Sequence, residues 1–111
     1  MKTNSVNFEG GTIIRDNEKY VLTDITYLEH MTVSKTELKP HQSTNGHFHD
    51  GLEEVYTFIE GEGTMRVGTT MHEVSAGSIV LIKGGEFHRV FNDSDKPLVF
   101  ITIHEKYERA S

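Results

Sequence analysis

The chain has 111 residues, of which 35% are hydrophobic and 25% charged, and its formal net charge is -6. We expect one domain over residues 1–111, with a compact core that a metal ion or an oligomer interface would help to stabilise. The net negative charge disfavours a general nucleic-acid binder, and the absence of cysteine excludes disulfides and thiolate ligands.

Short strand-like segments separated by turns run through the whole chain, and no segment has a convincing helical pattern. In chain order these segments are 12–15, 20–26, 30–38, 55–59, 64–67, 71–74, 78–82, 88–91 and 98–103. Glycine, asparagine or aspartate stands between most of the later ones, as in the turns of antiparallel sheets. Strands that recur every eight to twelve residues or so predict an all-β sandwich or barrel.

Two further features concern the location of the protein. No run of about 18 apolar residues is present, so no segment is expected to span a membrane. The first eight residues lack the apolar stretch of a secretory signal. We therefore expect a cytoplasmic protein without nucleic-acid or membrane partners; a small-molecule substrate is expected only on the basis of the residues that follow.

The chemically informative residues begin with His47 and His49, two of seven histidines. Residues two apart in an extended segment point to the same face, so both imidazoles project together while Phe48 points away. Imidazole suits Zn, Fe, Ni, Cu and Mn, and an added carboxylate favours the harder members of that series. A carboxylate is close in the sequence, at Glu54.

Strand alternation gives the register of the segment that Glu54 begins. If Glu54 faces inward, then Tyr56 and Phe58 also face inward and form an aromatic wall beneath the imidazoles. The neighbouring Glu53 then points to the other face. A third imidazole, His88, opens a strand further along the chain.

Together these residues resemble the two motifs of the cupin family. The first, Gly-x5-His-x-His-x3-4-Glu-x6-Gly, falls on position 41, His47, His49, Glu54 and Gly61. The second, Gly-x5-Pro-x-Gly-x2-His-x3-Asn, falls on Gly77, position 83, Gly85, His88 and Asn92. The motifs therefore span 41–61 and 77–92, and the three glycines stand where tight turns need a positive φ.

The resemblance implies both a fold and a metal site. The fold is a single antiparallel cupin barrel, which is a double-stranded β-helix or jelly roll. The implied ligands of one divalent metal ion (Mn, Fe, Zn or Ni) are His47, His49, Glu54 and His88. They leave one or two coordination positions for water or substrate.

The chain departs from the family pattern at two positions. His41 stands where the family usually has glycine, and Lys83 stands where it usually has proline. We interpret both as exposed loop residues. The alternatives are that His41 supplies an acid or base near the opening and that Lys83 contacts an anion over the barrel mouth. We expect three histidines that belong to neither motif, His30, His72 and His104, at the surface or rim.

Three functions remain open, because one barrel can host many reactions. The first is a sugar or sugar-phosphate isomerase or epimerase, since Thr44-x-Gly46-His47 and Glu54-x-Tyr56 resemble elements of cupin-type phosphoglucose isomerases. Tyr56 is then the candidate catalytic residue. The second is an Fe-dependent dioxygenase, and the third is a non-catalytic ligand-binding module. We expect a homodimer, because an N-terminal strand at 12–15 leaves an edge to cover.

Overall fold

Nine strands and one short 3-10 turn make up the regular structure in the part of the chain that the computed structural model describes, residues 4–47 and 51–107. The turn η1 is Phe8–Gly10, and the strands are β1 Thr12–Asp16, β2 Tyr20–Ile25, β3 Met31–Leu38, β4 Glu54–Glu60, β5 Glu62–Val67, β6 Thr70–Ser75, β7 Ile79–Ile82, β8 His88–Phe91 and β9 Leu98–Glu105. Every predicted strand is present within a few residues of its expected bounds. None of the described helical residues forms a segment that could cross a membrane.

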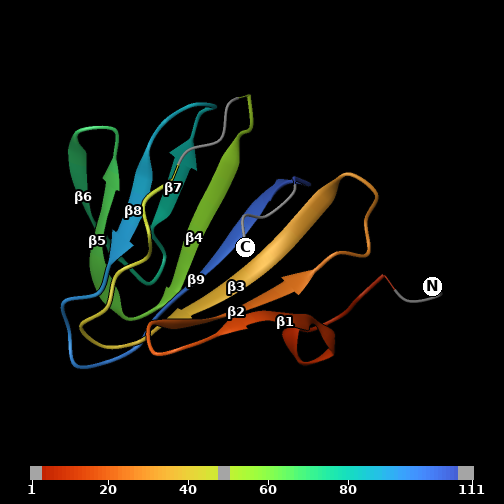
Figure 1. Cartoon of the computed structure of the whole chain (residues 1–111), viewed down its shortest axis with the longest axis horizontal. Helices are drawn as coiled ribbons and strands as arrows, with labels where there is room; N and C mark the ends of the chain where they lie inside the picture. The colour runs from red at the N-terminus through yellow and green to blue at the C-terminus, as the bar shows by residue number, and fades with distance from the viewer. Residues whose placement is uncertain (1–3, 48–50, 108–111) are drawn as a thin grey trace.

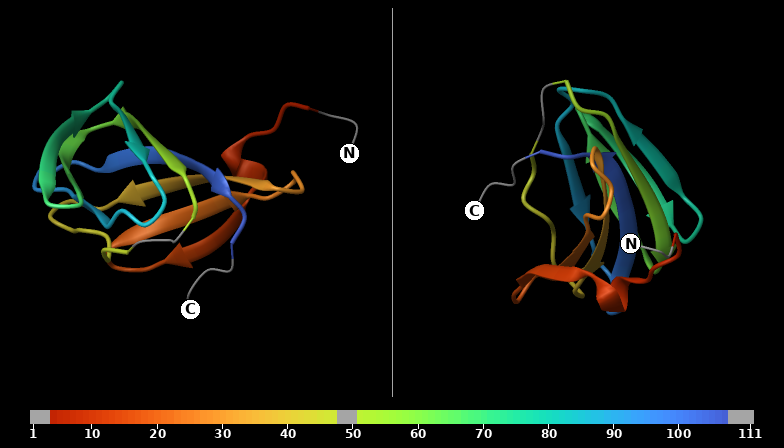
Figure 2. Two further views of the ribbon diagram at one scale, coloured as in Figure 1. Left: turned by 90° about the horizontal axis from the view of Figure 1, so that it is seen from above. Right: turned by 90° about the vertical axis from the view of Figure 1, so that its right-hand side faces the viewer.

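The strands form two facing antiparallel sheets (Figures 1 and 2). The larger sheet has the order β1-β2-β3-β9-β4-β7, and the smaller has the order β6-β5-β8. Strand β9, the last of the chain, lies between β3 and β4. The centre of the larger sheet is therefore formed by strands that are distant in sequence. This is the antiparallel jelly-roll barrel that the sequence predicts.

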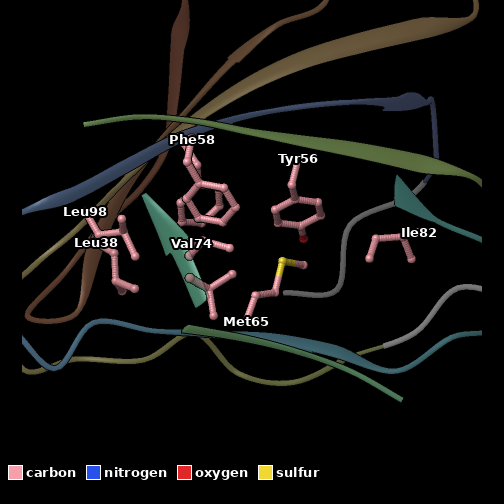
Figure 3. Packing of buried hydrophobic residues seen from close by; sticks show 9 residues of the cluster. Leu38, Tyr56, Phe58, Met65, Val74, Ile82 and Leu98 are labelled. Carbon is pink, nitrogen blue, oxygen red and sulfur yellow. The ribbon is translucent and has the colours of Figure 1, made fainter. Parts of the chain in front are cut away.

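The core fills the space between the two sheets, and strand alternation decides which side chains enter it. Tyr56 and Phe58 project from β4 towards Met65 and Val74 of the smaller sheet (Figure 3). Glu54 shares their face and is 4% exposed, whereas Glu53 is exposed. The predicted inward register of β4 is therefore confirmed.

The segment between β3 and β4 crosses from the larger sheet to the smaller and pairs with β8. Backbone amides of Thr44 and His47 donate to the carbonyls of Val90 and His88. At the far end of β8, the buried Asn92 amide group donates to the carbonyls of Leu38, Lys39 and Lys96. The second motif's asparagine thus ties β8 to the end of β3, which fixes where the crossing segment begins.

The turns explain one departure from the family pattern. Gly61, Gly77 and Gly85 all have the expected positive φ. At Gly61 a Cβ would also lie 2.3 Å from the carbonyl oxygen of Pro97. His41 has a φ of 59°, so the position where the family has glycine keeps its left-handed backbone here with a side chain attached. Its Nε2 lies 2.6 Å from Oδ1 of Asp95.

Candidate metal centre

The structure brings together His47, Glu54 and His88, which come from the crossing segment, β4 and β8. One potential ligand atom from each lies within 4.8 Å of the other two. Glu54 and His88 are buried, at 4% and 1% exposure, while His47 is exposed. Donor atoms at such separations can share one ion, because ligand bonds of about 2.0–2.2 Å place neighbouring ligands about 3–4 Å apart.

Backbone pairing explains why two histidines from different motifs meet. The amide of His47 donates to the carbonyl of His88, and the amide of His88 donates back to the carbonyl of His47, at 3.1 and 2.9 Å. Directly paired antiparallel residues project their side chains to the same side of the ladder. The two rings consequently lie with their centroids 4.4 Å apart, edge to face.

Backbone carbonyls also orient both imidazoles. Nδ1 of His47 lies 3.2 Å from the carbonyl oxygen of Asn45, and Nδ1 of His88 lies 3.0 Å from that of Glu86. An Nδ1–H that donates to a carbonyl leaves Nε2 as the nitrogen for a metal. Both carbonyl contacts therefore favour an Nδ1–H on each ring, which directs Nε2 towards a metal.

Glu54 and His88 form a close pair, with Oε2 and Nε2 separated by 2.8 Å. Burial alone would raise the pKa of Glu54, but the hydrogen bond and charge of His88, with the charges of His104 and His47, hold it below its usual value. Burial alone would lower the pKa of His88, but the hydrogen bonds to Glu54 and to the Glu86 carbonyl hold it above its usual value. A metal at this position would replace the proton that these two groups share.

The three side chains fit a divalent metal. Two imidazole nitrogens and one carboxylate oxygen suit the Mn, Fe, Ni and Zn series. Oε2 of Glu54 and Nε2 of His88 are both buried and aimed at one another, so one ion could satisfy both. The fourth predicted ligand, His49, lies outside the described residues, and its assignment stays a prediction.

A cavity of about 500 Å³ adjoins two of the three residues, His47 and Glu54. Its wall includes His47 and Glu54, together with Tyr56, Phe100 and Thr102. The ring of Tyr56 lies 5.6 Å from that of His88 and 5.5 Å from that of Phe100. The expectation that Tyr56 faces the cavity near the metal ligands agrees with this placement. The same expectation for Phe58 was wrong, because Phe58 packs in the core and does not line the cavity.

The remaining histidines and Lys83 divide into two groups. The first group is exposed and does not line the cavity, as expected; it consists of His30, His41, His72 and Lys83. His104, by contrast, was expected at the surface or rim and is only 3% exposed. It pairs directly with Glu54 across β9 and β4 and lines the cavity, with its Nδ1 2.8 Å from the carbonyl oxygen of Glu105.

Sequence reasoning also missed the contribution of the N-terminal strands to the cavity. Arg15, Asn17, Tyr20 and Leu22 line it, although the motifs begin only at position 41. The alternation of β9 could have placed His104 inward, since Phe100 and Thr102 share its parity. No local pattern marks Arg15, because its direction depends on an irregularity in the pairing of β1 with β2.

Comparisons with known proteins agree with this architecture. The model of the cupin domain family matches residues 34–104. Glucose-6-phosphate isomerase from Thermococcus litoralis is 32% identical over 68 residues, a match that covers 55% of this chain and only 36% of that enzyme. The solved structure of a predicted oxalate decarboxylase from Thermotoga maritima superposes with a TM-score of 0.81 at 20% identity, covering 93% of this chain and 99% of that one. An uncharacterized protein with a double-stranded beta-helix domain from Klebsiella pneumoniae has a TM-score of 0.80 at 19% identity, covering 94% and 90%.

Replacing a ligand should remove the metal. We expect His88→Ala, Glu54→Ala and the predicted ligand variant His49→Ala each to lose stoichiometric metal, because each change removes one donor from a small set. His72→Ala is the matched control, since His72 is exposed on β6 and remote from the cavity. Elemental analysis of untagged protein measures the outcome. Equal metal loss in the control and the ligand variants would mean that the assigned ligands are wrong.

Removing the metal should lower the melting temperature in a pH-dependent way. Ligation needs neutral imidazoles, so metal affinity falls as the pH drops below about 6.5, the ordinary pKa of histidine. In the metal-free barrel, the raised pKa of His88 gives stability that is present below about 6.5 and is lost as the pH rises through the raised value. The lowered pKa of Glu54 gives stability above its ordinary 4.5 that is lost on further acidification.

Between pH 7.5 and pH 5, the falling metal affinity and the stabilisation of the metal-free barrel by His88 both reduce the effect of removing the metal. We therefore expect a chelator to lower the melting temperature at pH 7.5, and expect this lowering to shrink towards pH 5. Thermal unfolding with and without chelator at pH 5, 6 and 7.5 measures it. The site assignment fails if protein shown to contain metal melts at the same temperature with chelator at pH 7.5.

Proposed function

The chain belongs to the cupin family, and we propose that it is a metal-dependent isomerase or epimerase of a sugar or sugar-phosphate substrate. The observation that carries the proposal is the cluster of His47, Glu54 and His88 beside a cavity whose wall is rich in hydroxyl and amide groups. Such groups suit a polyhydroxylated ligand, because each hydroxyl of the ligand can find a hydrogen-bond partner. The similarity to a glucose-6-phosphate isomerase supports the same substrate class.

In this proposal, residues 1–111 form one cupin domain and His47, His49, Glu54 and His88 hold one divalent ion. The ion, when bound, polarises a carbonyl oxygen or holds adjacent hydroxyl groups. The carbonyl contacts at Nδ1 keep His47 and His88 directed at the ion, and the burial of Glu54 excludes water from one side of it.

Proton movement falls to a side chain of the cavity wall. We assign this role to Tyr56, whose buried ring packs between the rings of His88 and Phe100. A phenol can both donate and accept a hydrogen bond, so it can hold a proton at a sugar oxygen. The stacking on Phe100 limits where the hydroxyl can go, which favours one substrate orientation.

Tyr56→Phe should lower turnover more than it lowers metal content, because the change removes only the hydroxyl. We expect kcat for the interconversion of glucose 6-phosphate or glucose with its ketose to fall by about 10²- to 10⁴-fold, the usual contribution of a general acid or base. Tyr27→Phe, at an exposed tyrosine away from the cavity, is the control. Chromatographic product analysis and elemental analysis are measured on the same samples.

The other two functions give different results in that experiment. A dioxygenase would consume O₂ with iron bound and form no ketose. A ligand-binding module would retain the sugar without converting it. Unchanged turnover in Tyr56→Phe with an active wild type would reject Tyr56 as the catalytic residue.

The outer face of the larger sheet supports the proposal of a homodimer. Leu81 of β7 pairs with Val55 of β4, Val55 with Ile103 of β9, and Ile103 with Val33 of β3. This gives an apolar row across four strands, in which Leu81 is 69% and Ile103 39% exposed. A monomer rarely leaves such a continuous apolar surface in water. A second copy related by a two-fold axis would cover it with the same uncharged row.

Leu81→Lys should therefore dissociate the dimer, because a charge would have to be buried in the centre of the apolar row. Met71→Lys introduces the same charge at an exposed apolar residue of β6, in the other sheet, and should leave the dimer intact. Sedimentation at micromolar concentration distinguishes the states. A wild-type mass of 12.6 kDa would contradict the homodimer.

A further inference from the structure

Arg15 stands out among the residues that line the cavity. It is the one arginine or lysine in the wall of the cavity, as far as the described residues show, and Glu54 is the one carboxylate there. The chain as a whole carries a net charge of -6. Arg15 therefore brings a guanidinium group to the cavity of an acidic protein.

The pairing of β1 with β2 explains how Arg15 reaches the cavity. Ile13 pairs with Thr23, but the register then shifts, and Arg15 rather than Ile14 pairs with Leu22. Leu22 is buried and lines the cavity, so the residue opposite it on the same face also points there. A bulge of this kind redirects a side chain, and here it directs Arg15 inward while Ile13 and Ile14 are exposed.

Arg15 lines the same cavity as Glu54, but from a strand that is not a neighbour of β4. Strand β1 is the edge of the larger sheet, and β2, β3 and β9 separate it from β4, which carries Glu54. Four inter-strand spacings of about 4.8 Å, measured along the curved sheet, therefore lie between them. Neutral polar side chains such as Asn17, Thr36 and Thr102 line the same cavity.

The charge balance of the cavity favours an anion. A bound divalent ion would outweigh the single charge of Glu54, and Arg15 adds a positive charge elsewhere in the cavity wall. Arginine presents a planar fork of N–H donors that matches the oxygens of a phosphate or carboxylate group.

From this geometry we propose that Arg15 binds an oxyanion group of the substrate, at the end of the cavity away from the metal ligands. The substrate class is then a sugar phosphate or a sugar acid, and neutral sugars bind weakly. Arg15 is a specificity-determining residue. The inference rests on the proposed function, because it specifies the substrate of that same site.

Calorimetry on the metal-loaded protein tests the inference with three probes, which are glucose 6-phosphate, gluconate and glucose. We expect Arg15→Gln to weaken the binding of the preferred anion by about 10- to 100-fold, the usual range for a charge-assisted hydrogen bond, and to leave glucose unchanged. Arg15→Lys should retain part of the affinity, because it keeps the charge and loses the fork. The tighter of the two anions identifies the source of the oxyanion.

Two controls separate the role of Arg15 from other causes. Arg66→Gln removes the same charge from an exposed position on β5 outside the cavity wall, and it should change no affinity. All variants are compared at equal metal content, so that a difference in anion affinity cannot result from a difference in bound metal. Raising the salt concentration should weaken the binding of the anion to wild type but not that of glucose, which tests the charge even if Arg15→Gln fails to fold.

The inference is overturned if wild type binds glucose as tightly as both anions, if it binds neither anion, or if Arg15→Gln binds the preferred anion as wild type does. These outcomes are separable from a failure of the proposed function, because binding is measured without turnover. Anion binding that depends on Arg15, without any ketose formed, would keep the anion site and reject the isomerase.

Discussion

Two backbone hydrogen bonds between His47 and His88 are the constraint on which the site depends. They join the segment that crosses between the sheets to the edge strand of the smaller sheet. They extend the pairing that the Thr44 amide makes with the Val90 carbonyl, and so hold the first motif against the second. With them, two imidazoles project side by side towards Glu54, whose place is fixed by the central pairing of β4 with β9. The same chain crossing thus closes the barrel and assembles the donor set.

Much of this arrangement could be predicted from the sequence, because it depends on parity and spacing. Strand alternation puts Glu54 and Tyr56 on one face and Glu53 on the other, and the motif resemblance indicates that the face of Glu54 is the inner one. Turn glycines marked most strand ends, so all nine strands could be located. The spacing of the two motifs indicated which histidine of the second half meets the first. These are local properties, and tertiary contacts do not alter them.

The residues that sequence reasoning missed depend on contacts between distant strands. His104 reaches the cavity because β9 pairs with β4, a pairing that joins the end of the chain to its middle. Arg15 reaches it because a register shift after Ile13 in the edge strand β1 turns Arg15 to the inner face of the sheet. Phe58 has the right parity, yet Phe100 and the smaller sheet enclose it, so it belongs to the core. Strand alternation predicts the face on which a side chain lies, and the packing of the whole barrel decides which residues it contacts.

The close pair of Glu54 and His88 has a consequence for the order in which the protein matures. In the absence of metal, each group already has the other as a partner at 2.8 Å, so neither charge is buried alone. Folding of this pair therefore does not require a metal, and in the proposed site the folded barrel would take its ion from whatever the surroundings supply. Affinities of nitrogen and oxygen sites rise along the divalent series from manganese to copper regardless of biological purpose. The ion found in a purified sample then records the growth medium as much as the chemistry, and reconstitution of chelated protein with one metal at a time is the informative preparation.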